Sequence, residues 1–136
     1  MTKKFVVVCM SRNEARVWNS GIEPNSQVLV FHPPHENAEY RKEREMREGG
    51  RFGEHFDKDY FESIVGALTG ADQILFVGHG KGKASWMLLL IQYLERKHSA
   101  LASKVMDSVE ADIENLTDGQ VLALAREWKE LNKFNN

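Results

Sequence analysis

The sequence predicts an α/β fold in one three-layer domain, with a mixed sheet of about five strands in the order βββ-α-β-α-β-α. Three short apolar segments precede the first strong helical pattern, and such a succession is typical of an antiparallel meander. From residue 57 onward helical and strand patterns alternate, which indicates crossover connections and parallel strands. The length of 136 residues suits a single domain, 1–136, with one buried core.

The first three strands are predicted at 4–10, 15–20 and 27–32. Residues 4–10, KFVVVCM, form a continuous β-branched and aromatic run, which is typical of a strand buried on both faces. The turn at 11–14 makes 15–20 its hairpin partner, and the prolines at 33–34 end the third strand.

Three helices and two strands are predicted after this meander. The helix at 85–97 is apolar nearly all round, so we expect it to be the most buried helix. Thr117 and Gln120 form a capping-box pattern at the start of the last helix, and Gly70 is expected to end the first. The predicted helices are 57–68, 85–97 and 117–134, and the predicted strands are 73–79 and 104–110.

Residues 35–56 differ from the rest of the chain because they contain few apolar side chains and many charges. Within them, 38–48 has good helix formers and oppositely charged pairs four residues apart, such as Arg44 and Glu48. Pairs of this kind contribute only about 0.2–0.5 kcal/mol each, so a helix here would be marginal. We therefore expect a mobile, charged projection at about 35–56.

Composition and charge exclude several classes of function. The chain is 42% hydrophobic and 28% charged, with a net charge of −2 and an isoelectric point of about 6.2. Because the protein has no net positive charge, its overall electrostatic field does not attract DNA or an anionic membrane, and we expect neither partner. Any contact with RNA would have to be made by a local group of cations. The single cysteine, Cys9, lies in an apolar run, where a buried hydrophobic role is favoured over a nucleophilic one. One cysteine, no signal-peptide pattern and no apolar run of about 20 residues together predict a cytoplasmic protein.

Two sets of residues suggest ligand chemistry but do not meet the patterns of known sites. The segment 78–85, GHGKGKAS, lacks the P-loop spacing, although Lys81 and Lys83 could hold a phosphate at the following helix. A plain glycine-rich turn is the alternative, and it is favoured. The five histidines do not show the spacing of a metal site, so we expect neither a metal nor a cofactor.

The segment 48–53, EGGRFG, is the strongest functional pattern in the sequence. Gly49 and Gly50 allow close backbone approach to a ligand, and Arg51 follows them at the end of the charged segment. A glycine-rich turn before a helix at 57 would explain the same residues without any function. Loops that project from a domain often carry function, which keeps the binding interpretation open.

Four segments of this chain resemble the middle domain of archaeal and eukaryotic class-1 peptide-release factors and Pelota, and especially small bacterial stand-alone relatives of that domain. These segments are VVVCMSRNEARVW, GADQILFVGHGKGK, HSALASKVM and LTDGQVLALAR. The resemblance implies a ribonuclease-H-like fold of the kind found in translational-machinery components. It also implies that Gly49 and Gly50 match the glycines of the Gly-Gly-Gln loop that promotes peptidyl-tRNA hydrolysis in release factors.

Arg51 then occupies the place of the glutamine. Arginine is always charged and only donates hydrogen bonds, so it suits an RNA phosphate better than it suits positioning a water molecule. The chain lacks the other release-factor domains, so stop-codon recognition is not implied.

The leading hypothesis is an accessory protein that contacts the ribosome or tRNA through Gly49, Gly50 and Arg51. One alternative is a peptidyl-tRNA ester hydrolase that uses the same three residues, with backbone amides of 50–52 as oxyanion donors. Another is a protein-interaction or homo-oligomeric module with no RNA role. The candidate RNA-binding residues are Arg44, Arg47, Arg51, Lys81 and Lys83.

Overall fold

The structure is a computed structural model that describes residues 4–11, 14–32, 51–78 and 86–132, with side chains described from residue 58 onward in the first long helix. Most of the charged projection predicted at 35–56, including the marginal helical pattern at 38–48, therefore lies outside the described residues.

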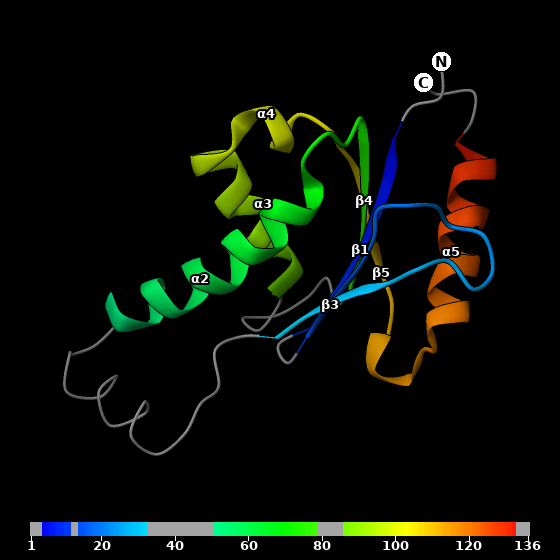
Figure 1. Ribbon diagram of the computed structural model, residues 1–136, viewed down its shortest axis with the longest axis horizontal. Helices are drawn as coiled ribbons and strands as arrows, with labels where there is room; N and C mark the ends of the chain where they lie inside the picture. Colours follow the sequence, from blue (N-terminus) through cyan, green and yellow to red (C-terminus); the bar gives the residue numbers. More distant parts are fainter. Residues whose placement is uncertain (1–3, 12–13, 33–50, 79–85, 133–136) are drawn as a thin grey trace.

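A five-stranded mixed sheet forms the centre of the fold, with the strand order β3-β2-β1-β4-β5 (Figure 1). Strands β1, β2 and β3 pair in antiparallel fashion, whereas β4 pairs in parallel with both β1 and β5. This confirms the predicted α/β class, the antiparallel meander and the parallel second half. The strands are β1 (Phe5–Met10), β2 (Ala15–Trp18), β3 (Leu29–Phe31), β4 (Gln73–Gly78) and β5 (Val105–Glu110).

Helices cover both faces of the sheet and make three layers (Figure 1). Helices α2 and α3 lie on one face, and α5 lies on the other. The helical elements are α2 (Arg51–Leu68), α3 (Trp86–Lys97), α4 (Ser99–Ala102), the 3₁₀ turn η1 (Ile113–Asn115) and α5 (Asp118–Leu131).

Strand β1 separates two apolar cores because its side chains alternate between the faces. Val6, Val8 and Met10 pack with α2 and α3, whereas Phe5, Val7 and Cys9 pack with α5. All six residues of β1 are buried, as predicted for a strand covered on both sides.

Helix α2 begins earlier than predicted. The sequence placed its start at residue 57, but the helix starts at Arg51. The prediction was wrong because the glycines and sparse apolar residues before 57 favour a turn, whereas the structure has residues 51–56, including Gly53, in the helix. The residues immediately after Gly50 are consequently helical rather than part of a loop.

Helix α3 is not the most buried helix, contrary to the prediction. Only one stripe of it packs on the sheet, whereas Leu88 and Leu89 are each 37% exposed. Helix α2 buries six residues between its positions 60 and 68. An all-round apolar composition therefore did not produce all-round burial.

The helix boundaries agree with the predicted capping signals. Thr117 Oγ1 accepts a hydrogen bond from the Gln120 amide at 3.2 Å, and Gln120 Oε1 accepts one from the Thr117 amide at 2.8 Å. Gly70, just past α2, has φ of +83°, which suits glycine. The two short elements α4 and η1 were not predicted. Over the part of the chain that the structure describes, no helix is long and apolar enough to cross a membrane.

Candidate functional site

The residues of the predicted RNA-binding site are only partly within the described structure. Arg51 is the first residue of α2, so Gly49 and Gly50 directly precede a helix. The glycines lie outside the described residues, and so do the other predicted cations Arg44, Arg47, Lys81 and Lys83. The proposed roles of these residues therefore stay predictions.

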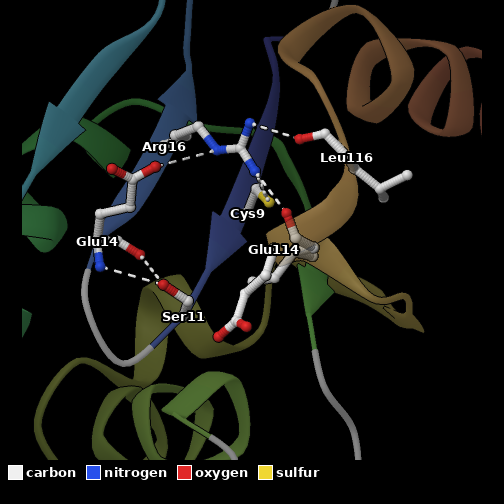
Figure 2. A pocket seen from close by; sticks show the side chains of 7 residues that line it. Cys9, Ser11, Glu14, Arg16, Glu114 and Leu116 are labelled. Carbon is white, nitrogen blue, oxygen red and sulfur yellow. Dashed lines mark hydrogen bonds and ion pairs between the residues drawn. The ribbon is translucent and has the colours of Figure 1, made fainter.

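A pocket lies at the carboxyl end of β1 and has a volume of about 260 Å³ (Figure 2). We call it the arginine pocket. Its floor is formed around the buried end of Arg16, which extends from β2 toward η1 and the start of α5. The lining residues are Cys9, Ser11, Glu14, Arg16, Ile113, Glu114 and Leu116.

The turn between β1 and β2 brings Glu14 to this pocket. The Ser11 amide donates to the Glu14 carbonyl at 2.9 Å, and the Ser11 hydroxyl accepts from the Glu14 amide at 3.1 Å. These bonds close the turn and direct the Glu14 carboxylate to Arg16 Nε, 3.6 Å away.

The guanidinium of Arg16 forms hydrogen bonds and ion pairs with other groups of the protein. Nη1 donates to Asp118 Oδ1 at 2.7 Å and to the Leu116 carbonyl at 3.4 Å. Nη2 donates to the Ile113 carbonyl at 3.3 Å and faces Cys9 Sγ at 3.4 Å. The four N–H donors of Nη1 and Nη2 thus have hydrogen-bond partners, and Nε faces the Glu14 carboxylate at ion-pair distance.

The charge of Arg16 is stabilised where it lies, although only 12% of its side chain is exposed. Burial lowers the pKa of Arg16, but the hydrogen bond to Asp118 and the nearby charges of Asp118 and Glu14 outweigh burial and raise it. Because no donor is left over, Arg16 joins β2 to η1 and α5 rather than binding a ligand.

Cys9 is a buried thiol, as the sequence predicted. It is 1% exposed, and burial raises its pKa from 9.0 to about 11, despite the opposing effect of Arg16. The thiolate is the nucleophilic form of cysteine, so this thiol is unsuited to nucleophilic catalysis near neutral pH. Within the described parts of the chain, no group of three or more potential metal-binding side chains is present.

A second polar cluster joins α2 to the segment that connects α3 and α4. Glu62 Oε2 accepts a hydrogen bond from the Tyr93 hydroxyl and lies 2.7 Å from His98 Nε2. The hydrogen bond with His98, followed by that with Tyr93, lowers the pKa of Glu62. Burial and then Glu62 raise the pKa of Tyr93 to about 12.

Neither cluster could be predicted from a local sequence pattern. His98 lies in the loop between α3 and α4 and is half-buried against Tyr93, with the two ring centroids 5.8 Å apart. Arg16 was interpreted only as part of a strand. Each cluster combines residues that are distant in the chain, so local pattern does not reveal it.

Comparison with known proteins gives a structural relative and no sequence relative. No family model and no curated protein matches the chain. Among solved structures, Pelota from Archaeoglobus fulgidus is similar with a TM-score of 0.51 and 7% sequence identity. The match covers 98% of this chain and 38% of the Pelota chain, whose structure is described as showing inter-domain plasticity.

This likeness shows that the chain shares its fold with part of an archaeal Pelota. It supports the expected translational-machinery type of fold, but the sequence comparisons do not add support for a release-factor middle domain. The chain spans well under half of the Pelota length, so what the whole Pelota chain does is not transferred with the fold.

Proposed function

We propose that this protein is a translation-related accessory domain that contacts ribosomal or transfer RNA through Gly49, Gly50 and Arg51. The observation that carries the proposal is the fold likeness to Pelota over 98% of the chain. The start of α2 at Arg51 adds a local physical reason.

A helix that starts at Arg51 directs its positive end toward the glycine pair. The first four N–H groups of an α-helix have no partner within the helix, and the helix dipole adds about half a positive charge there. Such an end attracts phosphate, and two preceding glycines present no side chain that would keep a phosphate away.

The opposite half of α2 is held firmly in the domain. Tyr60, Ile64 and Leu68 are at most 1% exposed, and Glu62 is bonded to Tyr93 and His98. The amino-terminal turns extend beyond the sheet on the side away from α5 (Figure 1). A well-anchored helix can therefore present its amino end to a large partner without rearrangement of the core.

Arginine at position 51 favours binding over hydrolysis. Its guanidinium matches phosphate geometry and carries a permanent charge. It cannot accept a hydrogen bond from an attacking water, so peptidyl-tRNA hydrolysis is the weaker alternative.

Sedimentation with purified ribosomes tests the proposal. At about 50 mM salt the wild-type protein should co-sediment, and Arg51→Ala should reduce the bound fraction severalfold because phosphate contacts dominate RNA affinity. Arg96→Ala is the matched control, since it removes the same charge from an exposed position on α3. Wild-type protein that stays in the supernatant with both ribosomes and tRNA would refute the proposal.

Two further measurements separate the alternatives. Release of peptide from peptidyl-tRNA by the wild type, or by Arg51→Gln, would favour the hydrolase. Light scattering that shows a dimer without RNA binding would favour the protein-interaction module.

A further inference from the structure

The outer edge of β5 is the longer of the two free edges of the described sheet. Strand β5 has six residues and pairs only with β4, whereas β3, the strand at the opposite edge, has three residues. The N–H and C=O groups of an edge strand that point away from its sheet can pair with a strand of another molecule. The β5 edge is therefore the place in this sheet where such pairing has to be either used or prevented.

The main-chain groups of Ser108 and Glu110 point outward from this edge. The Ala111 amide donates to the Gly78 carbonyl of β4 at 2.9 Å, so it points into the sheet. Main-chain amides alternate in direction along a strand, and the amides of Ser108 and Glu110 therefore point away from β4. Both residues are exposed. The edge thus has, at these two positions, the donors and acceptors that an added strand needs.

The carboxylate of Asp107 is bonded to the first of these outward donors. Its Oδ1 accepts a hydrogen bond from the Ser108 amide at 2.8 Å, and its Oδ2 accepts one from Trp128 Nε1 of α5, also at 2.8 Å. Because the bond to α5 orients the carboxylate, its negative charge stays beside the edge of the strand. A strand that approached this edge would have to displace the carboxylate from the Ser108 amide.

A bulge and an exposed apolar side chain lie next to Asp107. The pairing with β4 passes from Val105 directly to Asp107, so Met106 is skipped. The Met106 side chain is 38% exposed, which places an apolar group on a free edge. Exposed apolar residues on such an edge favour association between molecules, whereas bulges and charged side chains oppose it. Asp107 is the charged residue that directly follows this apolar group in the strand.

We propose that Asp107 blocks the outer edge of β5 against pairing with a second copy of this chain. Its carboxylate occupies the outward amide of Ser108, and it holds a negative charge where an added strand would lie. A second copy would bring the same charge to the same edge, and like charges on paired strands repel. The second copy is the relevant partner because two identical edges can pair with each other about a two-fold axis.

Sedimentation velocity of Asp107→Ala tests this role. Wild type should stay monomeric at 15.6 kDa up to about 100 μM, whereas the variant should shift toward about twice that mass. Glu95→Ala is the charge control, because it removes one carboxylate from an exposed position of α3. Trp128→Phe is the second control, since it removes the bond to Oδ2 but leaves Asp107 on the Ser108 amide. Both controls should remain monomeric.

Two further measurements determine whether the freed edge makes the contact. Proline has no N–H group, so the double variant Asp107→Ala with Ser108→Pro should return to the monomer. In associated Asp107→Ala, the Glu110 amide should exchange its hydrogen severalfold more slowly than in monomeric wild type, because it would be paired. Asp107→Thr repeats the sedimentation test with a residue that favours strands, which keeps the test available where alanine weakens β5.

The inference is overturned when Asp107→Ala or Asp107→Thr is folded by circular dichroism and yet monomeric throughout this range. Association of Trp128→Phe to the same extent also overturns it, as does association that persists in the double variant. Wild type that associates with a protected Glu110 amide would show that the edge is not blocked. The proposed RNA contact fails separately, because sedimentation of Arg51→Ala with ribosomes changes α2 and leaves β5 intact.

Discussion

Charged side chains lie near both ends of β1, but they differ in burial and in their bonding partners. At the carboxyl end, the guanidinium of Arg16 is almost buried and every donor has a protein partner. At the amino end, Lys4 and Lys129 line a larger cavity and contact only a carbonyl and a ring. Cys9 of the arginine pocket lies on the face of the sheet that α5 covers. The cavity at the amino end is lined by Phe5 and Lys129 on that same face and by Lys4, whose ammonium lies at the end of α2 on the other face.

The difference follows from the cost of taking a charge out of water. A buried charge destabilises the fold unless it is paired and hydrogen-bonded, whereas an exposed ammonium remains hydrated without any partner. The guanidinium of Arg16 therefore stabilises the fold through its partners, whereas the ammonium groups of Lys4 and Lys129 contribute little to stability. Net charge alone does not distinguish these uses.

The largest expected effect is at Arg16. Arg16→Ala should lower the free energy of unfolding by about 3 kcal/mol, because it leaves Asp118 and two carbonyls near a buried void without their donor. Lys129→Ala should cost less than about 0.5 kcal/mol, since its ammonium is exposed. Urea unfolding followed by circular dichroism measures both. Equal losses in the two variants would abolish the distinction between the pockets.

The second expected effect concerns the backbone conformation of Gly21, in the segment that follows β2. Gly21→Ala should lower the free energy of unfolding by about 1–2 kcal/mol, since φ of +140° strains any side chain and the new Cβ meets Glu23. Gly66→Ala is the control: Gly66 lies within α2 with no atom within 4 Å of a built Cβ, so alanine should stabilise by about 0.5–1 kcal/mol. Thermal unfolding of both variants checks the prediction. A Gly21→Ala variant as stable as wild type would mean that residues 19–23 can rearrange to accept the new side chain.

The fold could be predicted from sequence where one local pattern determines the result. Six consecutive apolar residues at β1 allow little other than a strand covered on both faces. The Thr117 capping box likewise specified the start of α5. The start of α2 was missed because the glycines near residue 50 obscure the helical pattern.

The two pockets could not be predicted because their residues meet only in the folded chain. Arg16 lies 100 residues from its Leu116 partner, and Lys4 and Lys129, which line one cavity, come from opposite ends of the chain. A strand of four residues, ARVW, shows that Arg16 alternates with apolar neighbours, but it does not show which carbonyls the guanidinium reaches. The predicted glycine-arginine site remains a prediction, because the experiment at Arg51 has to test it.

Titration of Cys9 tests how well this thiol is shielded from solvent beside the arginine pocket. The folded-state pKa of this thiol is raised by burial from 9.0 to about 11, so its stabilising contribution is complete below pH 9 and is lost as pH rises toward 11. Between pH 8 and pH 10 the unfolding free energy of wild type should fall by about 1 kcal/mol more than that of Cys9→Ala. Parallel pH dependences of the two proteins would show that solvent reaches the thiol in the folded protein.

The smallest expected effect is at Glu62, whose carboxylate is paired like Arg16 but is 40% exposed. Glu62→Gln should lower the free energy of unfolding by about 0.5 kcal/mol at pH 7, because solvent screening weakens the bonds to His98 and Tyr93. The folded-state pKa of Glu62 lies below its usual 4.5, so this contribution is present above pH 4.5 and disappears as pH falls below that value.

Urea unfolding at pH 7 and pH 3 measures the change, with Glu95→Gln as the control at an exposed glutamate of α3. A loss at Glu62 as large as that at Arg16 would show that pairing, and not burial, determines how much a charged group stabilises this fold. A small loss of stability that occurs only at pH 7 would instead show that Glu62 contributes less than Arg16 and more than Lys129, because it is paired but still hydrated. The exposed fraction of each charged side chain would then explain how much it stabilises the fold, from the buried guanidinium of Arg16 to the exposed ammonium of Lys129.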